Sequence, residues 1–167
     1  SQPFFCYLAT NAPHAPYIVA DKYADLYRGN PDIPEPEFYG MITNIDENFG
    51  RLRRLLQARG IADDTILIFM TDNGTSGGID PRTGRGYNAG MRGKKGSYYD
   101  GGHRVPCFVR WPRGGIGGGD VHALVTHLDL LPTLCELCAL DIPEHKPWDG
   151  LSVAPLLRRQ RQSLPDR

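Results

Sequence analysis

Two oxygen-bearing side chains stand next to each other in the segment Thr71-Asp72-Asn73-Gly74. A carboxylate and a carboxamide both offer oxygen atoms, which are the ligands that hard cations such as Ca²⁺ and Mg²⁺ prefer. Gly74 lets the backbone turn sharply where a side chain would obstruct it. The same residues also form a common turn sequence, so the motif by itself supports either a cation site or a simple turn.

A histidine follows the first apolar run of the chain. His14 lies between Pro13 and Pro16, and prolines restrict the path of the backbone around it. A histidine can bind an oxyanion, donate a proton or ligate a metal. The alternative is a surface histidine in a proline-rich turn.

Two lysines lie between glycines in the segment Arg92-Gly93-Lys94-Lys95-Gly96-Ser97. Such glycines let the backbone approach a ligand while a cation points at it, as anion sites require. A solvated loop charge is the alternative. Further along, His103 or Arg104 could assist anion binding, and structural ion pairing explains them equally well.

The elements that would position these residues follow from hydrophobic spacing. Residues 4–9 are apolar and predict a buried strand, and Thr65–Thr71 predict a strand buried on both faces. Between them, apolar residues at spacings of three and four predict a helix of roughly 22 residues that ends before Gly60; they are Met41, Ile45, Phe49, Leu52 and Leu56. Strand, helix and strand form a βαβ-like unit, which predicts an α/β fold with a mostly parallel or mixed sheet flanked by helices.

The rest of the chain contains a long loop and further short elements. Residues 72–103 hold ten of the 20 glycines, and a loop of this length inside a compact domain is usually functional. Ligands of open α/β sheets bind beyond the carboxyl ends of the strands, where Asp72 and Asn73 stand. We expect a strand at 105–111, a short one at 124–126, and a helix from about Asp129 to Leu140.

Composition narrows the class of protein. Among 167 residues, Lys+Arg and Asp+Glu are balanced at 19 each, which gives no argument for a nucleic-acid or anionic-membrane partner. No apolar run approaches the roughly 20 residues needed to span a bilayer. Cys135 and Cys138 form a C-x-x-C pair, which can indicate zinc or redox chemistry. Because they and the other two cysteines, Cys6 and Cys107, lie in apolar patterns, we expect four buried, reduced thiols.

The order of these motifs resembles the sulfatase family of the alkaline-phosphatase-like superfamily. The resemblance extends over residues 4–157. Five segments carry it: Phe5–Pro16, Tyr39–Gly50, Thr65–Gly74, Arg92–Pro106 and His127–Thr133.

The resemblance implies roles for four residues. Asp72 and Asn73 match two of the four protein ligands of the family's divalent cation, usually Ca²⁺, with Mg²⁺ possible. His14 and Lys95 match residues that contact the sulfate ester and stabilise or protonate the leaving oxygen. Lys95 is chosen over Lys94 because it directly precedes Gly96-Ser97 and the later Gly101-Gly102.

The chain also departs from the family pattern. Sulfatases use a formylglycine made from Cys or Ser in a C/S-x-P-x-R sequence, and no cysteine here begins that pattern. We therefore expect residues 1–157 to be the carboxy-terminal portion of the catalytic domain, followed by a polar tail or the start of a linker at 158–167. The nucleophile and two acidic metal ligands are expected in an amino-terminal segment that completes the fold, and the isolated chain is expected to be inactive.

The function expected for the parent protein is hydrolysis of a small-molecule or glycan sulfate ester. Two alternatives stay open. The parent could be a phosphodiesterase or phosphonate hydrolase of the same superfamily, or a non-catalytic binding protein on a sulfatase scaffold.

Overall fold

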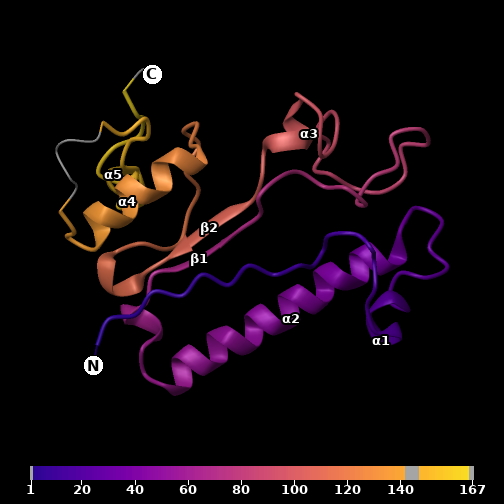
Figure 1. Cartoon of the computed structure of the whole chain (residues 1–167), viewed down its shortest axis with the longest axis horizontal. Helices are drawn as coiled ribbons and strands as arrows, with labels where there is room; N and C mark the ends of the chain where they lie inside the picture. Colours follow the sequence, from indigo (N-terminus) through magenta and orange to yellow (C-terminus); the bar gives the residue numbers. More distant parts are fainter. Residues whose placement is uncertain (1, 142–146, 166–167) are drawn as a thin grey trace. The chain divides into compact units, whose positions relative to one another are not determined.

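The computed structural model describes residues 2–141 and 147–165 and divides into two compact units. The first comprises Ser1–Ala58 and Met70–Pro106, and the second comprises Arg59–Phe69 and Cys107–Arg167. No helix of the described residues has the length and apolar character needed to cross a bilayer. The helices and strands of both units are labelled in Figure 1.

The first unit is built on a long helix. Helix α2 (Pro36–Ala58) runs beside the short helix α1 (Asp21–Ala24), and both precede the long loop that reaches helix α3 (Asp100–His103). Of the apolar face predicted for α2, Met41 and Leu56 are buried and the three residues between them are half-buried. Gly60 follows the helix with a φ of +68°, the left-handed conformation that favours a glycine stop. The prediction of this helix is confirmed.

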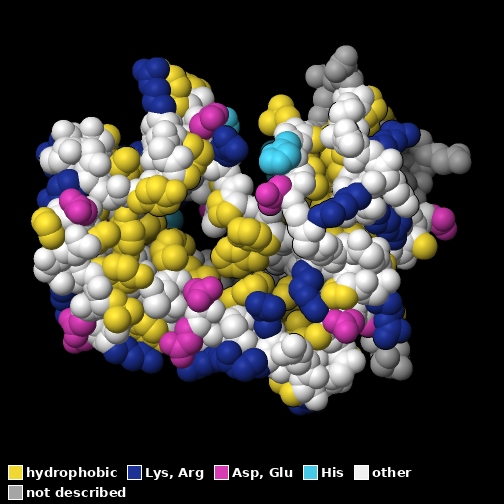
Figure 2. Space-filling model, turned by 180° about the vertical axis from the view of Figure 1, so that it is seen from behind, with side chains coloured by type: hydrophobic (Ala, Val, Ile, Leu, Met, Phe, Trp, Pro, Cys, Tyr) yellow, Lys and Arg dark blue, Asp and Glu magenta, His cyan; other side chains and the backbone are white. Residues whose placement is uncertain are grey.

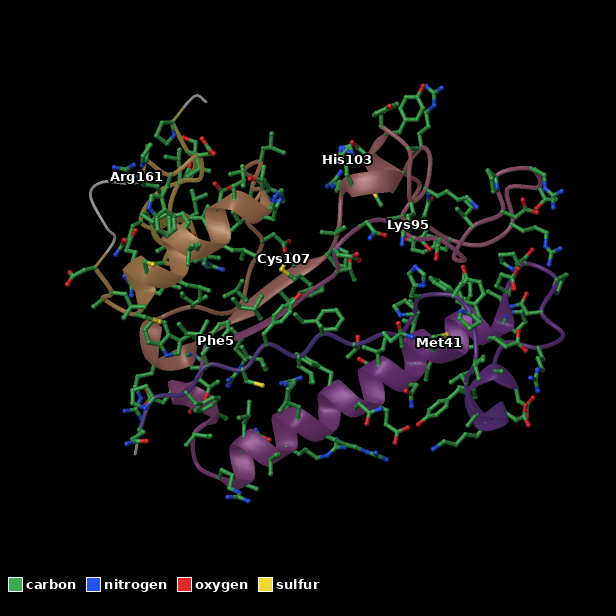
Figure 3. All side chains as sticks on the ribbon, in the orientation of Figure 1. Phe5, Met41, Lys95, His103, Cys107 and Arg161 are labelled. Atoms are coloured by element: carbon green, nitrogen blue, oxygen red, sulfur yellow. The ribbon has the colours of Figure 1, made fainter. Side chains whose placement is uncertain are left out.

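The prediction of a strand at residues 4–9 is wrong. Residues 2–11 form no regular element, and Phe5 and Tyr7 are each 83% exposed. A strand needs a neighbour for its backbone groups, and in the described residues the one sheet contains only two other segments. Phe5 therefore lies on an extended, unpaired segment (Figure 3).

All of that small sheet except Met70 belongs to the second unit. It pairs strand β1 (Leu67–Met70) with strand β2 (Cys107–Arg110), and both are shorter than predicted. Residues 67–69 are half-buried and Met70 is exposed, so the prediction of a strand buried on both faces is wrong. Residues 124–126 form no strand. Figure 2 shows patches of exposed hydrophobic side chains among polar side chains and backbone.

The core of the second unit lies between its helices and loops. Ile116, Leu137 and Ala154 are buried together, with Val109 and Trp111 packed against them. Three elements form or adjoin this core. They are the 3-10 turn His127–Asp129, helix α4 (Leu130–Leu137) and helix α5 (Ala154–Leu157). Helix α4 confirms the helix predicted near residues 129–140, although it is shorter.

A buried carboxylate holds the start of α4 to the chain that follows it. Asp129 has an exposed fraction of 0% and accepts hydrogen bonds from the backbone N–H groups of Thr126, at 2.7 Å, and Leu151, at 2.9 Å. Its own carbonyl accepts the hydroxyl of Thr133 at 2.6 Å, and that hydroxyl accepts the Val153 N–H at 2.9 Å. Residues more than twenty positions apart are joined in this way.

The cysteine prediction is correct for one residue in four. All four thiols are free, but Cys135 alone is buried, whereas Cys6, Cys107 and Cys138 are exposed. Cys135 lies within α4, while Cys138 follows the last residue of that helix. In the segments that the structure describes, no three His, Cys, Asp or Glu residues gather as a metal site would require.

Candidate active site

The Asp72–Asn73 pair lies directly after β1, where the chain leaves the sheet. The Asn73 amide nitrogen donates a hydrogen bond to Asp72 Oδ2, and the Thr71 hydroxyl donates to the Asn73 carbonyl at 3.3 Å. Turning the Asn73 amide by half a rotation would present its oxygen beside the carboxylate. The donor chemistry of the pair fits a hard cation. Because Ca²⁺ takes about 6–8 oxygen ligands, further ligands would have to come from outside the pair.

Glycines hold the loop after Asp72 against helix α3. The Gly74 N–H donates to the Gly102 carbonyl at 2.9 Å, and a Cβ on Gly74 would overlap the Gly101 carbonyl oxygen. A Cβ on Gly101 would in turn overlap the Gly93 carbonyl oxygen. Three stretches of backbone therefore approach more closely than any side chain would permit.

Lys95 is fixed beside the same loop through its backbone. Its N–H donates to the carbonyl of Thr75 at 2.9 Å, while the Thr75 hydroxyl accepts the Gly78 N–H at 2.8 Å. The Lys95 side chain is exposed, on the loop between β1 and α3 (Figure 3). Thr75 is three residues from Asp72, so the structure brings the backbone of Lys95 to the segment that carries the oxygen pair.

His14 is joined to the loop after Asp72 less directly than Lys95 is. Its ring Nδ1 lies 2.7 Å from the Ala15 carbonyl oxygen and the side chain is exposed. Three residues later, the Tyr17 hydroxyl donates to Ser76 Oγ at 3.1 Å. No hydrogen bond among the described residues joins the His14 ring to Asp72 or Lys95. The structure thus anchors the histidine's segment at the loop without bringing its ring into contact with the other candidates.

The contacts of Arg104 and His103 fit the structural alternative, in which these side chains pair with nearby groups of the chain. Arg104 Nη1 lies 3.9 Å from Asp100 Oδ2, with both side chains exposed. His103 Nδ1 lies 3.2 Å from the Tyr99 carbonyl oxygen, one helical turn earlier. Each side chain has a partner within α3 or beside it, so neither needs an anion to explain its position.

Two residues that fix the backbone of the candidate site, Thr75 and Tyr39, were not identified from the sequence. Thr75 joins Lys95 to Gly78, and the Tyr39 hydroxyl donates to the Gly78 carbonyl at 2.7 Å while accepting the Tyr87 N–H at 3.0 Å. A threonine after a turn, with an N–H three residues later, is a recognisable local hydrogen-bonding pattern. Tyr39 gives no such signal, because its partners lie 39 and 48 residues away.

Comparisons with known proteins decide the family. A family model described as Sulfatase matches residues 1–140. The chain belongs to the sulfatase family. It is 34% identical to human arylsulfatase A over 168 residues and 30% identical to the sulfatase YdeN of Escherichia coli K12 over 168 residues. Among solved structures, that of Ps i-CgsB in complex with k-i-k-neocarrahexaose superposes with a TM-score of 0.82 at 30% identity, covering 99% of this chain.

These similarities confirm the α/β, alkaline-phosphatase-like fold class in partial form, with a small sheet flanked by helices. The chain spans 29% of YdeN, 31% of arylsulfatase A and 37% of the Ps i-CgsB chain. It is therefore about a third as long as the relatives that it matches.

Proposed function

We propose that the complete protein hydrolyses a sulfate ester at a site to which this chain contributes Asp72, Asn73, His14 and Lys95. The observation that carries the proposal is the junction at Thr75 and Gly74. There, hydrogen bonds of 2.9 Å join the segment of Asp72 and Asn73 to Lys95 and to Gly102. Membership of the sulfatase family supports the reaction.

Lys95 and His14 would act on the sulfate group. An ammonium group supplies fixed positive charge and up to three hydrogen-bond donors where negative charge grows in the transition state. A histidine can donate a proton to the leaving oxygen, and general acid catalysis contributes roughly 10²–10⁴-fold to rates. The Lys95 backbone bond and the Tyr17–Ser76 bond hold both segments at the loop.

Asp72 and Asn73 would hold a divalent cation, Ca²⁺ or alternatively Mg²⁺. Their carboxylate and amide oxygens suit a hard ion. A bound cation lowers the free-energy cost of charge on the sulfate oxygens. The nucleophile, a formylglycine, would belong to a part of the protein outside this chain.

The substrate is a small-molecule or glycan sulfate ester. Relatives include proteins named arylsulfatase A and N-acetylgalactosamine-6-sulfatase, both human, at 34% and 33% identity. Ps i-CgsB was solved with a neocarrahexaose. Both substrate classes therefore occur among proteins similar to this one.

Single substitutions in the full-length protein test the proposal. Lys95→Ala and His14→Ala should each lower kcat on an aryl sulfate by about two orders of magnitude or more, because each removes a group that acts in the transition state. Lys94→Ala removes the neighbouring charge and should change kcat by less than about threefold. Near-native turnover of Lys95→Ala or His14→Ala would refute that assignment, and faster turnover of a phosphate diester than of the sulfate would favour phosphodiesterase chemistry.

A further inference from the structure

An arginine and a tyrosine at the two ends of one loop stack on each other. The central carbon of the Arg92 guanidinium lies 3.7 Å from the centre of the Tyr99 ring, well inside the roughly 6 Å within which a cation is attracted to an aromatic face. Arginine suits this contact because its guanidinium is planar and weakly hydrated. Tyr99 is 46% exposed, so the pair lies partly in solvent. The stack joins two residues that are seven positions apart in the chain.

Backbone hydrogen bonds close the same loop beside the stack. The Gly101 N–H donates to the Arg92 carbonyl at 2.8 Å, and the Gly102 N–H donates to the Tyr99 carbonyl at 2.7 Å. Both donors belong to helix α3. Residues 92–99 therefore form a loop whose two ends are held at the start of α3, by the backbone and by the stacked side chains together.

The middle of this loop packs against the same helix. The Ser97 N–H donates to the Lys94 carbonyl at 2.9 Å, and the Ser97 hydroxyl oxygen is buried. A Cβ on Gly102 would overlap the Ser97 carbonyl oxygen and would lie 3.0 Å from that of Lys94. The short segment from Lys94 to Ser97 thus rests directly on α3, and a shift of the loop ends relative to α3 would displace it.

Lys95 lies within the closed loop. Its N–H donates to the Thr75 carbonyl at 2.9 Å, and its side chain is exposed (Figure 3). Because the four-carbon stem of a lysine is flexible, the position of the ammonium group depends on how firmly the backbone beneath it is held. The Thr75 bond fixes one point of that backbone, and the Arg92–Tyr99 stack holds the loop ends on either side of it.

We propose that Arg92 and Tyr99 are positioning residues for Lys95: their stack keeps the loop of residues 92–99 closed and so keeps the Lys95 ammonium group at the reacting sulfate. This inference rests on the proposed sulfate-ester hydrolysis, in which Lys95 acts on the sulfate. It assigns the Arg92 cation to the loop and not to the substrate. Direct contact of Arg92 with the sulfate is the competing role, and the experiments below distinguish the two.

Kinetics of the full-length protein on an aryl sulfate test the pair. Tyr99→Ala should lower kcat by about five- to tenfold and change KM by less than about twofold, because a small displacement of an acting group is costly in the transition state. Tyr99→Phe should retain kcat within about twofold, since a cation is attracted to the face of Phe as well. Tyr98→Ala, which removes the neighbouring and 100% exposed ring, is the matched control and should have no effect.

A double-mutant cycle separates positioning from direct binding. If Arg92 acts only through Tyr99, Arg92→Ala should cost about as much as Tyr99→Ala, and the double variant should cost no more than either single variant. Additive losses, or a loss in Arg92→Ala about tenfold greater than that in Tyr99→Ala, would assign Arg92 to the substrate and overturn the proposal. A loss in Tyr99→Phe or Tyr98→Ala as large as that in Tyr99→Ala would overturn it too.

Amide hydrogen exchange tests the closed loop without reference to turnover. In the full-length protein, the peptide that contains Gly101 and Gly102 should exchange about two- to fivefold faster in Tyr99→Ala, the range expected for one exposed cation–π contact. In Tyr98→Ala it should exchange at the unaltered rate. Equal exchange in all three proteins would reject the role of the stack in closing the loop. If Tyr99→Ala exchanges faster but the unaltered protein hydrolyses no sulfate ester, the proposed reaction fails and the loop closure stands.

Discussion

The residue types required in the candidate site depend on close backbone contacts as much as on the chemistry of the side chains. The types and order of Asp72, Asn73 and Lys95 can be recognised in the sequence, because their motifs are contiguous. The contacts of Gly74 and Gly101 cannot, because a glycine at a close approach and a glycine at a flexible turn have the same sequence signal. The need for glycine at these two positions becomes clear only from the positions of the neighbouring carbonyl groups.

A methyl group at Gly74 tests this interpretation. Gly74→Ala should lower the free energy of unfolding by about 1–3 kcal/mol, because its Cβ would overlap the Gly101 carbonyl and either the loop or helix α3 would have to move. Chemical denaturation measures the change. Gly117→Ala is the matched control, since no atom lies within 4 Å of the Cβ position there. Equal stability of the two variants would show that the loop and helix α3 do not pack so closely.

Among the elements, the helix specified by local spacing was predicted closely, whereas strands, which depend on a distant partner, were predicted too long at β1 and β2 and were predicted at 4–9 where none forms. The apolar repeat of α2 and its Gly60 stop lie within one stretch of chain, so Pro36–Ala58 was recognisable. The apolar residues 4–9 have the composition of a strand, yet composition does not supply a paired neighbour. The hydrogen bonds of Asp129 to residues 126 and 151 were also not predicted, because the burial of a carboxylate depends on the surrounding fold.

The Asp129 carboxylate should matter more to stability than any exposed acid. Asp129→Ala leaves the N–H groups of Thr126 and Leu151 without their acceptor, and each such loss costs about 1–3 kcal/mol. Thermal or denaturant unfolding should show a loss of roughly that size or greater. Asp149→Ala, at an exposed position, should change stability by less than about 0.5 kcal/mol. If the two substitutions cost the same, the buried carboxylate does not hold α4 to the following chain.

Arg28 links α1 to α2 and should leave a signature in the titration of Glu37. Arg28 Nη2 lies 3.0 Å from Glu37 Oε1, while Nη1 contacts Asp21 and Asp25. The hydrogen bond from Arg28 lowers the pKa of Glu37 below its usual 4.5. Because the folded-state pKa is the lower one, the associated stabilisation is present above pH 4.5 and is lost as the pH falls through the folded-state value.

Carboxyl NMR titration measures this pKa. Arg28→Met should return the Glu37 titration toward its usual range, since the hydrogen bond that lowers the pKa is gone. Arg51→Met, which instead removes the ion-pair partner of Glu47, should leave the titration of Glu37 unchanged. A Glu37 titration that is the same in all three proteins would contradict the link between α1 and α2.

At the scale of the whole molecule, this chain is about a third of the length of its relatives. None of its four cysteines begins a C-x-P-x-R segment, and the S-x-P-x-R spacing occurs at Ser163–Arg167, after the residues that carry the resemblance. We therefore expect the 167-residue chain alone to show no turnover of an aryl sulfate under conditions in which the full-length protein is active. Measurable hydrolysis by the isolated chain, abolished by Lys95→Ala, would mean that the chain supplies its own nucleophile.

The proposed function requires four side chains to meet around one cation and one tetrahedral anion. A crystal structure of the full-length protein with Ca²⁺ and sulfate bound tests this most directly. We predict oxygens of Asp72 and Asn73 at about 2.3–2.6 Å from the cation, with Lys95 Nζ and a ring nitrogen of His14 within hydrogen-bonding distance of the sulfate. A cation held without Asp72 and Asn73, or a sulfate that neither Lys95 nor His14 contacts, would contradict it.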